Sequence, residues 1–256
     1  MHEAVPILHR DARCAVVAKP AGVASHRGWS ADDDALLQRA RDTLGVWVYL
    51  IHRLDRGASG AVLFALDAEA ARFFSDEFAA GRADKRYLAI TRGHPPEHLL
   101  LDYAIPSAPG EPRVPAVTEL WCKETFGRYA LVEAHPKTGR LHQIRRHLKH
   151  LSCPLIGDVR YGKGEHNRLF RTEHGLSRLA LHSTSLTIAH PEGSTLHVEC
   201  PLPDDMTGAI ASCKERYAGM ERTEPPPRQR EEPSDEQGDD QREGASDPSD
   251  ATSPRD

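Results

Sequence analysis

The stretch His52-Arg53-Leu54-Asp55-Arg56-Gly57-Ala58-Ser59-Gly60 runs directly into an apolar segment that ends at Leu66. That segment has the length and composition of a buried β-strand. Asp55 therefore stands in a polar loop at the edge of a strand, between two arginines. Burial alone raises the pKa of a carboxylate, so a buried nucleophile or base of this type needs a cationic neighbour to stay ionised. From these residues alone, Asp55 is either catalytic or one half of a structural ion pair with Arg53 or Arg56, and both interpretations stay open.

Strand and helix patterns alternate on both sides of this loop. An Asp at position 67 can cap a helix that ends at Gly81, and the spacing of leucines predicts another helix over 34–44. Because some predicted strands are adjacent and others are separated by helices, the pattern predicts an α+β fold with a mixed sheet. The remaining predicted strands cover 5–8, 14–18, 85–91, 129–133, 179–189 and 196–200; the remaining helices cover 141–151 and 204–217; 106–115 and 152–170 are predicted loops.

The net charge of -5 averages two regions of different composition. Residues 222–256 contain eleven acidic and five basic residues, six prolines and two alanines as their apolar content, and this composition cannot bury a core. We expect residues 1–221 to form one folded catalytic domain of near-neutral charge and residues 222–256 to form a disordered, acidic, proline-rich tail.

Several classes of protein are excluded by composition. The longest uncharged apolar stretch, from Gly57 to Leu66, is too short to cross a bilayer, and the charged N-terminus does not resemble a secretory signal. Five cysteines without a CxxC pair favour free thiols and exclude a zinc ribbon or a disulfide scaffold. We therefore expect a cytoplasmic protein without a membrane partner.

A basic block spans Ala134 to Gly157, where 24 residues include no Asp or Glu. If its leucines and Ile144 face the core, the basic side chains cover the rest of a helix and can contact several phosphates of RNA or DNA. The alternative is a solvated helix face. His147 and His150 are spaced for a metal, but three protein ligands are the usual minimum and no acidic residue lies near them in sequence, so we predict no metal site.

Four motifs in this chain resemble those of the RluA-type family of pseudouridine synthases, and they follow the family order. The first is 52–56 followed by Ser59-Gly60, the second is Lys85-Arg86-Tyr87, and the third is Gly139-Arg140-Leu141-His142-Gln143-Ile144-Arg145. Lys19-Pro20-Ala21-Gly22 resembles an early family element, and Pro154-Leu155-Ile156-Gly157-Asp158 follows the third motif as the family expects. The resemblance covers roughly residues 5–199, and segments 145–150 and 164–168 are most similar to members that act on tRNA.

The resemblance implies an enzyme that converts a uridine in RNA to pseudouridine. It implies a mainly antiparallel central sheet with flanking helices and an active-site cleft across the sheet. By the same resemblance, Asp55 is the nucleophile, Arg145 is its ion-pair partner and Tyr87 packs beside the target base, while Arg53 takes the place of the nucleotide flipped out of the helix. No cofactor and no metal are implied.

The expected substrate is tRNA, at a uridine of the T stem, and the expected oligomeric state is a monomer. Two alternatives stay open: the same chemistry on ribosomal RNA, and an RNA-binding or folding factor that keeps the fold without catalysis. The residues predicted to bind RNA are basic side chains around the first and third motifs: Arg53, Arg56, Lys137, Arg140, His142, Arg146 and Lys149.

Overall fold

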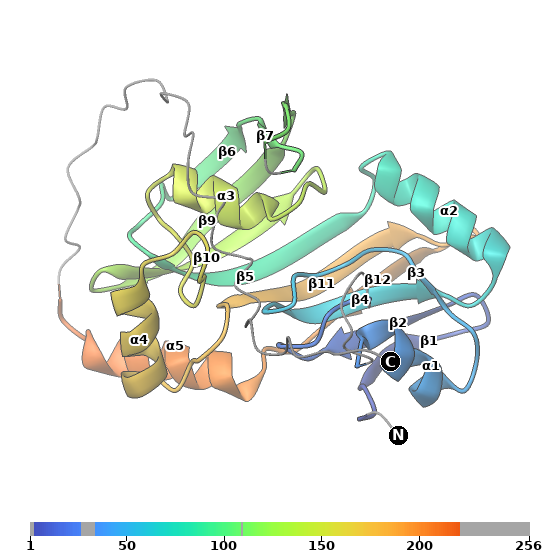
Figure 1. Ribbon diagram of the computed structural model, residues 1–256, viewed down its shortest axis with the longest axis horizontal. Helices are drawn as coiled ribbons and strands as arrows, with labels where there is room; N and C mark the ends of the chain where they lie inside the picture. Colours follow the sequence, from blue (N-terminus) through green and yellow to red (C-terminus); the bar gives the residue numbers. More distant parts are fainter. Residues whose placement is uncertain (1–2, 27–33, 109, 221–256) are drawn as a thin grey trace, which may run out of the picture.

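A ten-stranded sheet crosses the molecule in the computed structural model, which describes residues 3–26, 34–108 and 110–220 (Figure 1). The helices are α1 (Leu36–Leu44), α2 (Ala68–Ala79), α3 (Gln143–His150), α4 (Gly164–Glu173) and α5 (Asp204–Arg216). The strands are β1 (Ile7–Arg10), β2 (Cys14–Lys19), β3 (Tyr49–Leu50), β4 (Ser59–Ala65), β5 (Asp84–Arg92), β6 (His98–Asp102), β7 (Ile105–Pro106), β8 (Arg113–Val114), β9 (Val117–Phe126), β10 (Tyr129–Pro136), β11 (Leu181–Ala189) and β12 (Thr195–Glu199).

The sheet has the strand order β1-β2-β4-β11-β5-β10-β9-β6, with β12 paired to β11 and β3 paired to β4. The pair β4 and β11 is parallel, and the other pairs of this sheet are antiparallel. The short strands β7 and β8 form a separate hairpin. The prediction of an α+β fold with a mixed, mainly antiparallel sheet is confirmed.

Strand β4 is buried along its whole length because the sheet is covered on both faces. Val62 and Phe64 belong to the core that contains the buried side of α1, whereas Leu63 and Ala65 alternate onto the face covered by Phe74 of α2. Helix α2 begins where predicted, because the Asp67 side chain accepts a hydrogen bond from the Ala70 N–H at 2.9 Å.

The other end of the sheet carries α3, α4 and α5, while α1 and α2 lie near β1–β4 (Figure 1). Ile90 of β5 and Tyr129 of β10 pack with Phe170 of α4 and Ile210 of α5 in a third core cluster. Neighbouring residue Ala89 faces the opposite cluster, which also contains Leu148 of α3. The strands that connect the two ends therefore place the loop before β4 next to β5 and the start of α3.

Two sequence expectations differ from the structure. The predicted loop 152–170 is wrong in its second half, because α4 begins at Gly164 and its apolar residue Phe170 packs against the sheet. Strands β6 and β9 were not predicted because their sequences, HLLLD and VTELWCKETF, lack a regular alternation of apolar and polar residues. No helix among the described residues is both long and apolar enough to cross a bilayer. The tail predicted over 222–256 lies outside the described residues.

Candidate active site

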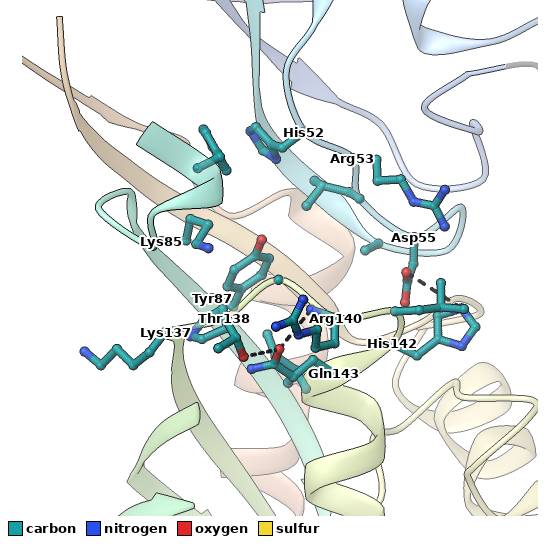
Figure 2. A pocket seen from close by; sticks show the side chains of 18 of the residues that line it. His52, Arg53, Asp55, Lys85, Tyr87, Lys137, Thr138, Arg140, His142 and Gln143 are labelled. Carbon is teal, nitrogen blue, oxygen red and sulfur yellow. Dashed lines mark hydrogen bonds and ion pairs between the residues drawn. The ribbon is translucent and has the colours of Figure 1, made fainter. Parts of the chain in front are cut away.

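An open pocket of about 670 Å³ lies where the loop before β4, the strand β5 and the segment leading into α3 meet. Its walls come from residues 51–55, 78–81 and 136–145, together with Lys85 and Tyr87. Figure 2 shows Asp55 and His142 on one side of this pocket and Tyr87 and Lys85 on the other. The first, second and third sequence motifs therefore converge on one cavity.

Asp55 is paired with a guanidinium from 90 residues further along the chain. Nη1 of Arg145 donates a hydrogen bond of 3.0 Å to Oδ2 of Asp55, whose side chain is 23% exposed. The other nitrogens of Arg145 bind Asp158: Nε donates to Oδ2 at 2.7 Å and Nη2 donates to Oδ1 at 2.9 Å. A planar fork with several donors can hold two carboxylates in this way, which a lysine cannot do.

The Arg145–Asp158 pair is buried, and its charges stabilise each other. Burial acts to lower the pKa of Arg145, but hydrogen bonding and charge from Asp158, and then from Asp55, outweigh burial and raise it. Burial raises the pKa of Asp158, and its bonds to Arg145 and to the backbone N–H groups of Arg160 and Tyr161 outweigh that effect and lower it. Arg145 is thus a permanent cation beside Asp55, as the resemblance implied.

The segment 19–25 holds the loop that carries Asp55. Lys19 is 1% exposed, and its Nζ donates to the carbonyl oxygens of Arg56 and Ala58 at 3.2 and 2.7 Å and to that of Pro20 at 2.8 Å. The Ser25 hydroxyl donates to the Leu54 carbonyl at 2.9 Å and accepts from the Leu54 N–H at 3.0 Å. The backbone on both sides of Asp55 is therefore fixed by side chains of another segment.

A glycine lets the loop that carries Asp55 approach β11. Gly60 has a φ of 123°, and a Cβ atom at this position would lie 2.3 Å from the carbonyl oxygen of Ser183. Only glycine fits this combination of positive φ and close backbone contact. The Ser59-Gly60 pair of the first motif therefore permits β4 and β11 to pair beside Asp55.

The turn into α3 is built around Gln143, a buried amide with four partners. Its Oε1 accepts from the Thr138 hydroxyl at 2.7 Å and from the Arg140 N–H at 3.0 Å. Its Nε2 donates to the Val117 carbonyl at 2.9 Å and to the Thr118 hydroxyl at 2.8 Å. These bonds fix the segment 138–143, which lines the pocket.

His142 has a φ of 54°, a left-handed conformation that is uncommon for a residue other than glycine. Its Nε2 lies 3.9 Å from Oδ1 of Asp55, and its Nδ1 is hydrogen-bonded to the Tyr161 hydroxyl at 3.2 Å. Burial lowers the pKa of His142; the charge of Asp55 opposes this shift, and neighbouring arginines reinforce it. The ring is therefore neutral near pH 7 and faces the free side of the Asp55 carboxylate.

Tyr87 lies on β5, where its neighbours across the sheet are Ala134 of β10 and Ser183 of β11. The ring is 8% exposed and lines the pocket. Burial raises the pKa of the Tyr87 phenol to about 12, a hydrogen bond with Ser183 opposes the shift, and the charge of Asp55 adds to it. The phenol is consequently neutral, and it offers a flat apolar face near the carboxylate.

The residues predicted to bind RNA fall into two groups. Arg53, Lys137, Arg140 and His142 line the pocket with Asp55. The other three do not line it: Arg56 donates through Nε to the Gly22 carbonyl at 2.8 Å, Arg146 donates through Nε to the Tyr161 hydroxyl at 3.0 Å, and Lys149 is exposed on α3.

The expectation that basic residues cover the outer face of the 141–151 helix is wrong for part of α3. Arg145 and His147 point into the protein, and His147 bonds through Nδ1 to the Thr118 hydroxyl at 2.9 Å and through Nε2 to the Tyr103 carbonyl at 3.0 Å. His150 stacks on Tyr103. The helix thus uses its basic residues for internal bonds as well as for its surface, and His147 and His150 are occupied by packing and hydrogen bonds.

Sequence reasoning missed two residues of the site. In the sequence, Asp158 stands only as the end of a motif and Lys19 only as the first residue of an early family element, and neither has an assigned role. An aspartate after Pro-Leu-Ile-Gly and a lysine at the end of a buried strand are the available signals, since a charged residue at such a position needs a partner. Neither signal identifies the partner.

Comparison with known proteins gives consistent matches. The family model for RNA pseudouridylate synthase matches residues 13–150, a range that contains Asp55, Tyr87 and Arg145. The chain is 38% identical to tRNA pseudouridine synthase C of Haemophilus ducreyi over 211 residues, covering 73% of this chain and 86% of the relative. The chain is also 38% identical to the Vibrio parahaemolyticus protein of the same name over 208 residues, which cover 72% of this chain and 85% of that relative.

Solved structures match at the level of the fold. Human RNA pseudouridylate synthase domain containing 4 aligns with a TM-score of 0.68 and 27% identity, over 82% of this chain and 93% of that chain. Human RNA pseudouridylate synthase domain containing 1 aligns with a TM-score of 0.65 and 27% identity, over 78% of this chain and 84% of that chain.

Proposed function

This chain belongs to the family of RNA pseudouridylate synthases, and on that premise we propose that it isomerises a specific uridine of tRNA, in the T stem, to pseudouridine. The tRNA substrate is supported by the curated relatives, which carry the name tRNA pseudouridine synthase C. The observation that carries the proposal is the ion pair between Asp55 and Arg145 inside a pocket formed by all three motifs.

The reaction rearranges one nucleotide without changing its atoms. The bond between N1 of uracil and C1′ of ribose breaks, the base turns, and a bond forms between C5 and C1′; C5 loses a proton and N1 gains one. We propose that the Asp55 carboxylate is the nucleophile that splits this exchange into two steps. Its role requires that it stay ionised, and Arg145 supplies the positive charge for that.

Tyr87 and His142 are proposed to border the base. Tyr87 presents a neutral ring across the pocket from the carboxylate, which suits stacking with uracil. Because Asp55 cannot reach a stacked nucleotide, the uridine must leave the helix at a cost of a few kcal/mol (about 2–4), and the exposed Arg53 at the pocket is placed to fill the vacated position.

RNA docking is proposed to use Arg53, Lys137 and Arg140 at the pocket and Lys149 on α3, because these four side chains are exposed. For Arg56 and Arg146, the bonds to Gly22 and Tyr161 favour a supporting role, in which each residue shapes a surface that RNA contacts.

We propose that the enzyme acts as a monomer in the cytoplasm and needs no cofactor or metal for catalysis.

The substrate is tested by incubating the purified chain with total tRNA and, separately, with ribosomal RNA, both lacking pseudouridine, followed by site-resolved mapping. We expect a new pseudouridine at a defined uridine of tRNA. Modification of ribosomal RNA alone would replace the proposed substrate while keeping the reaction. Tight RNA binding without any new pseudouridine would instead support a binding or folding factor.

A further inference from the structure

Three metal-ligating side chains meet at the edge of the sheet, and a fourth contacts one of them. Among the described residues, His9, Asp11 and Cys14 place one nitrogen, one oxygen and one sulfur atom within 4.8 Å of one another. His190, from the turn between β11 and β12, adds its Nε2 at 3.4 Å from Oδ2 of Asp11. The β1–β2 turn and the β11–β12 turn therefore contribute to one cluster.

The distances around Asp11 fit a small tetrahedral ion. Oδ2 lies 3.4 Å from Sγ of Cys14, 3.4 Å from Nε2 of His190 and 2.7 Å from Nε2 of His9. Zinc binds oxygen and nitrogen at about 2.0–2.2 Å and sulfur at about 2.3 Å, so its tetrahedral ligands stand about 3.3–3.6 Å apart. Two of the three separations already match, and a small rotation of the half-buried His9 ring opens the third.

His190 provides an independent indication of a ligand. Its side chain is 6% exposed, and its Nε2 is buried without a hydrogen-bond partner among the described residues. Buried polar atoms usually have partners, so such an atom calls for one. It lies 3.4 Å from the Asp11 carboxylate oxygen that His9 and Cys14 also contact, so it borders the group of three.

The other oxygen of Asp11 keeps the carboxylate in place. Oδ1 accepts hydrogen bonds from the N–H groups of Arg13 and Cys14, each at 2.7 Å, so Oδ2 is the oxygen left to face the cluster. Burial raises the pKa of the Cys14 thiol to about 12, and the negative charges of Asp11 and Glu192 add to this shift; the same charges attract a cation. Cys14 and His190 are buried, whereas His9 and Asp11 are about one-third exposed and leave a path for the ion.

We propose that His9, Asp11, Cys14 and His190 bind one zinc ion that joins the β1–β2 turn to the β11–β12 turn. On binding, the Cys14 thiol releases its proton to solvent and the thiolate sulfur bonds the metal. Nε2 of His190 also becomes a ligand, so the ring proton moves to Nδ1 and the 3.3 Å contact from the Glu192 N–H is given up. The site is structural and has no part in the proposed isomerisation.

The proposed zinc site lies too far from the pocket to take part in the isomerisation. Cys14 pairs with Ala65 at one end of β4, whereas Lys19 pairs with Gly60 at the end beside Asp55. Five residues along a strand span roughly 17 Å, so the metal lies far from the catalytic pocket.

The test uses the full chain, freed of metal with a chelator, and titrates it with Co²⁺ as a spectroscopic probe and with Zn²⁺ by calorimetry. We expect one equivalent of each to bind and Co²⁺ to give a sulfur-to-metal charge-transfer band. Cys14→Ser should abolish that band, whereas Cys213→Ser, which removes another buried thiol in α5, should keep it. A band that persists in Cys14→Ser, or no stoichiometric binding to the native chain, overturns the proposal.

Histidine variants keep the test decisive if Cys14→Ser does not fold. His9 is partly exposed, so His9→Gln should fold and should bind Zn²⁺ at least about 100-fold more weakly. His197→Gln, on the exposed side of β12, is the matched control and should bind like the native chain. Equal affinity of the His9 and His197 variants would contradict the site. Pseudouridine formation should be the same with and without zinc, so this result is separate from that of the substrate test.

Discussion

Arg145 and Asp158 are joined by two hydrogen bonds of 2.7 and 2.9 Å, and this pairing leaves Nη1 of Arg145 directed at Asp55. The Asp158 side chain is fully buried, and it is in turn fixed by the backbone of residues 160 and 161. Arg145 therefore cannot turn away from Asp55 without leaving a buried charge unpaired. The position of the proposed nucleophile depends on a residue that is not in the pocket wall.

Asp158→Asn is expected to reduce both stability and activity. The amide removes the negative charge that holds Arg145, and breaking a buried pair in this way costs about 3 kcal/mol. A shift of Arg145 by an ångström can lower the rate by about 100-fold. Urea denaturation and single-turnover pseudouridine formation measure the two effects.

The matched control is Asp205→Asn, because Asp205 binds Arg178 through two hydrogen bonds of 2.7 Å. This pair is more exposed and does not line the pocket. We therefore expect Asp205→Asn to lose less stability than Asp158→Asn and to keep the activity of the native chain. Equal activity of the Asp158 and Asp205 variants would show that Arg145 does not need Asp158.

Lys19→Met is expected to loosen the loop that carries Asp55. The variant keeps the length of the side chain but leaves the Arg56 and Ala58 carbonyls without their donor, at a cost of about 2 kcal/mol in unfolding free energy. We expect a lower rate at saturating RNA, since Asp55 directly precedes Arg56 in this loop. Lys123→Met, at an exposed lysine paired with Glu133, controls for the loss of a lysine. If Lys19→Met reacted at the native rate, the proposal that Lys19 holds the Asp55 loop in place would be wrong.

His52 makes stability depend on pH. Burial lowers the pKa of His52 to about 3, with the charge of Lys85 adding to the effect, whereas the unfolded value is about 6.5. As pH falls below 6.5, the unfolded chain takes up a proton that the folded chain does not, so folding stability is lost between pH 6.5 and 3. Relative to His52→Gln, the native chain should lose about 2 kcal/mol between pH 6.5 and 5. Chemical denaturation measures the free energy of unfolding of both proteins at each pH. If the two values changed in parallel with pH, the predicted loss of stability through His52 would be wrong.

Lys149→Ala tests whether RNA reaches α3. As an exposed phosphate contact, Lys149 should contribute about one unit to the slope of log affinity against log salt concentration. Arg216→Ala, in α5 and paired with Glu173, is the control and should leave the slope unchanged. If the two variants share the native slope, α3 has a merely solvated face.

The sequence allowed the strand after Asp55 and the helix after Asp67 to be predicted, because each depends on local burial and capping. Strand β9 could not be predicted in the same way, since most of its side chains are only partly buried. Helix α4 begins in a Gly-, His- and Arg-rich stretch, and it is stabilised by packing of Phe170 against a distant part of the sheet.

In the candidate site, too, contacts between residues close in sequence could be predicted, whereas contacts between distant residues could not. Spacing identified Asp55 as a carboxylate that needs a cation, and the arginines beside it in sequence were the nearest candidates. The structure places Arg145 there instead, while Arg56 bonds to Gly22. Only family resemblance indicated Arg145, because no periodicity relates residues 90 positions apart. The link from Arg145 to Asp158 is likewise a property of the folded chain.

The central claim is that Asp55, held by Arg145, is the nucleophile that isomerises uridine. A single-turnover assay with excess Asp55→Asn enzyme and a defined tRNA, with folding verified by thermal denaturation, tests it most directly. The variant should bind the tRNA and form no pseudouridine. Pseudouridine formation at the native rate would contradict it.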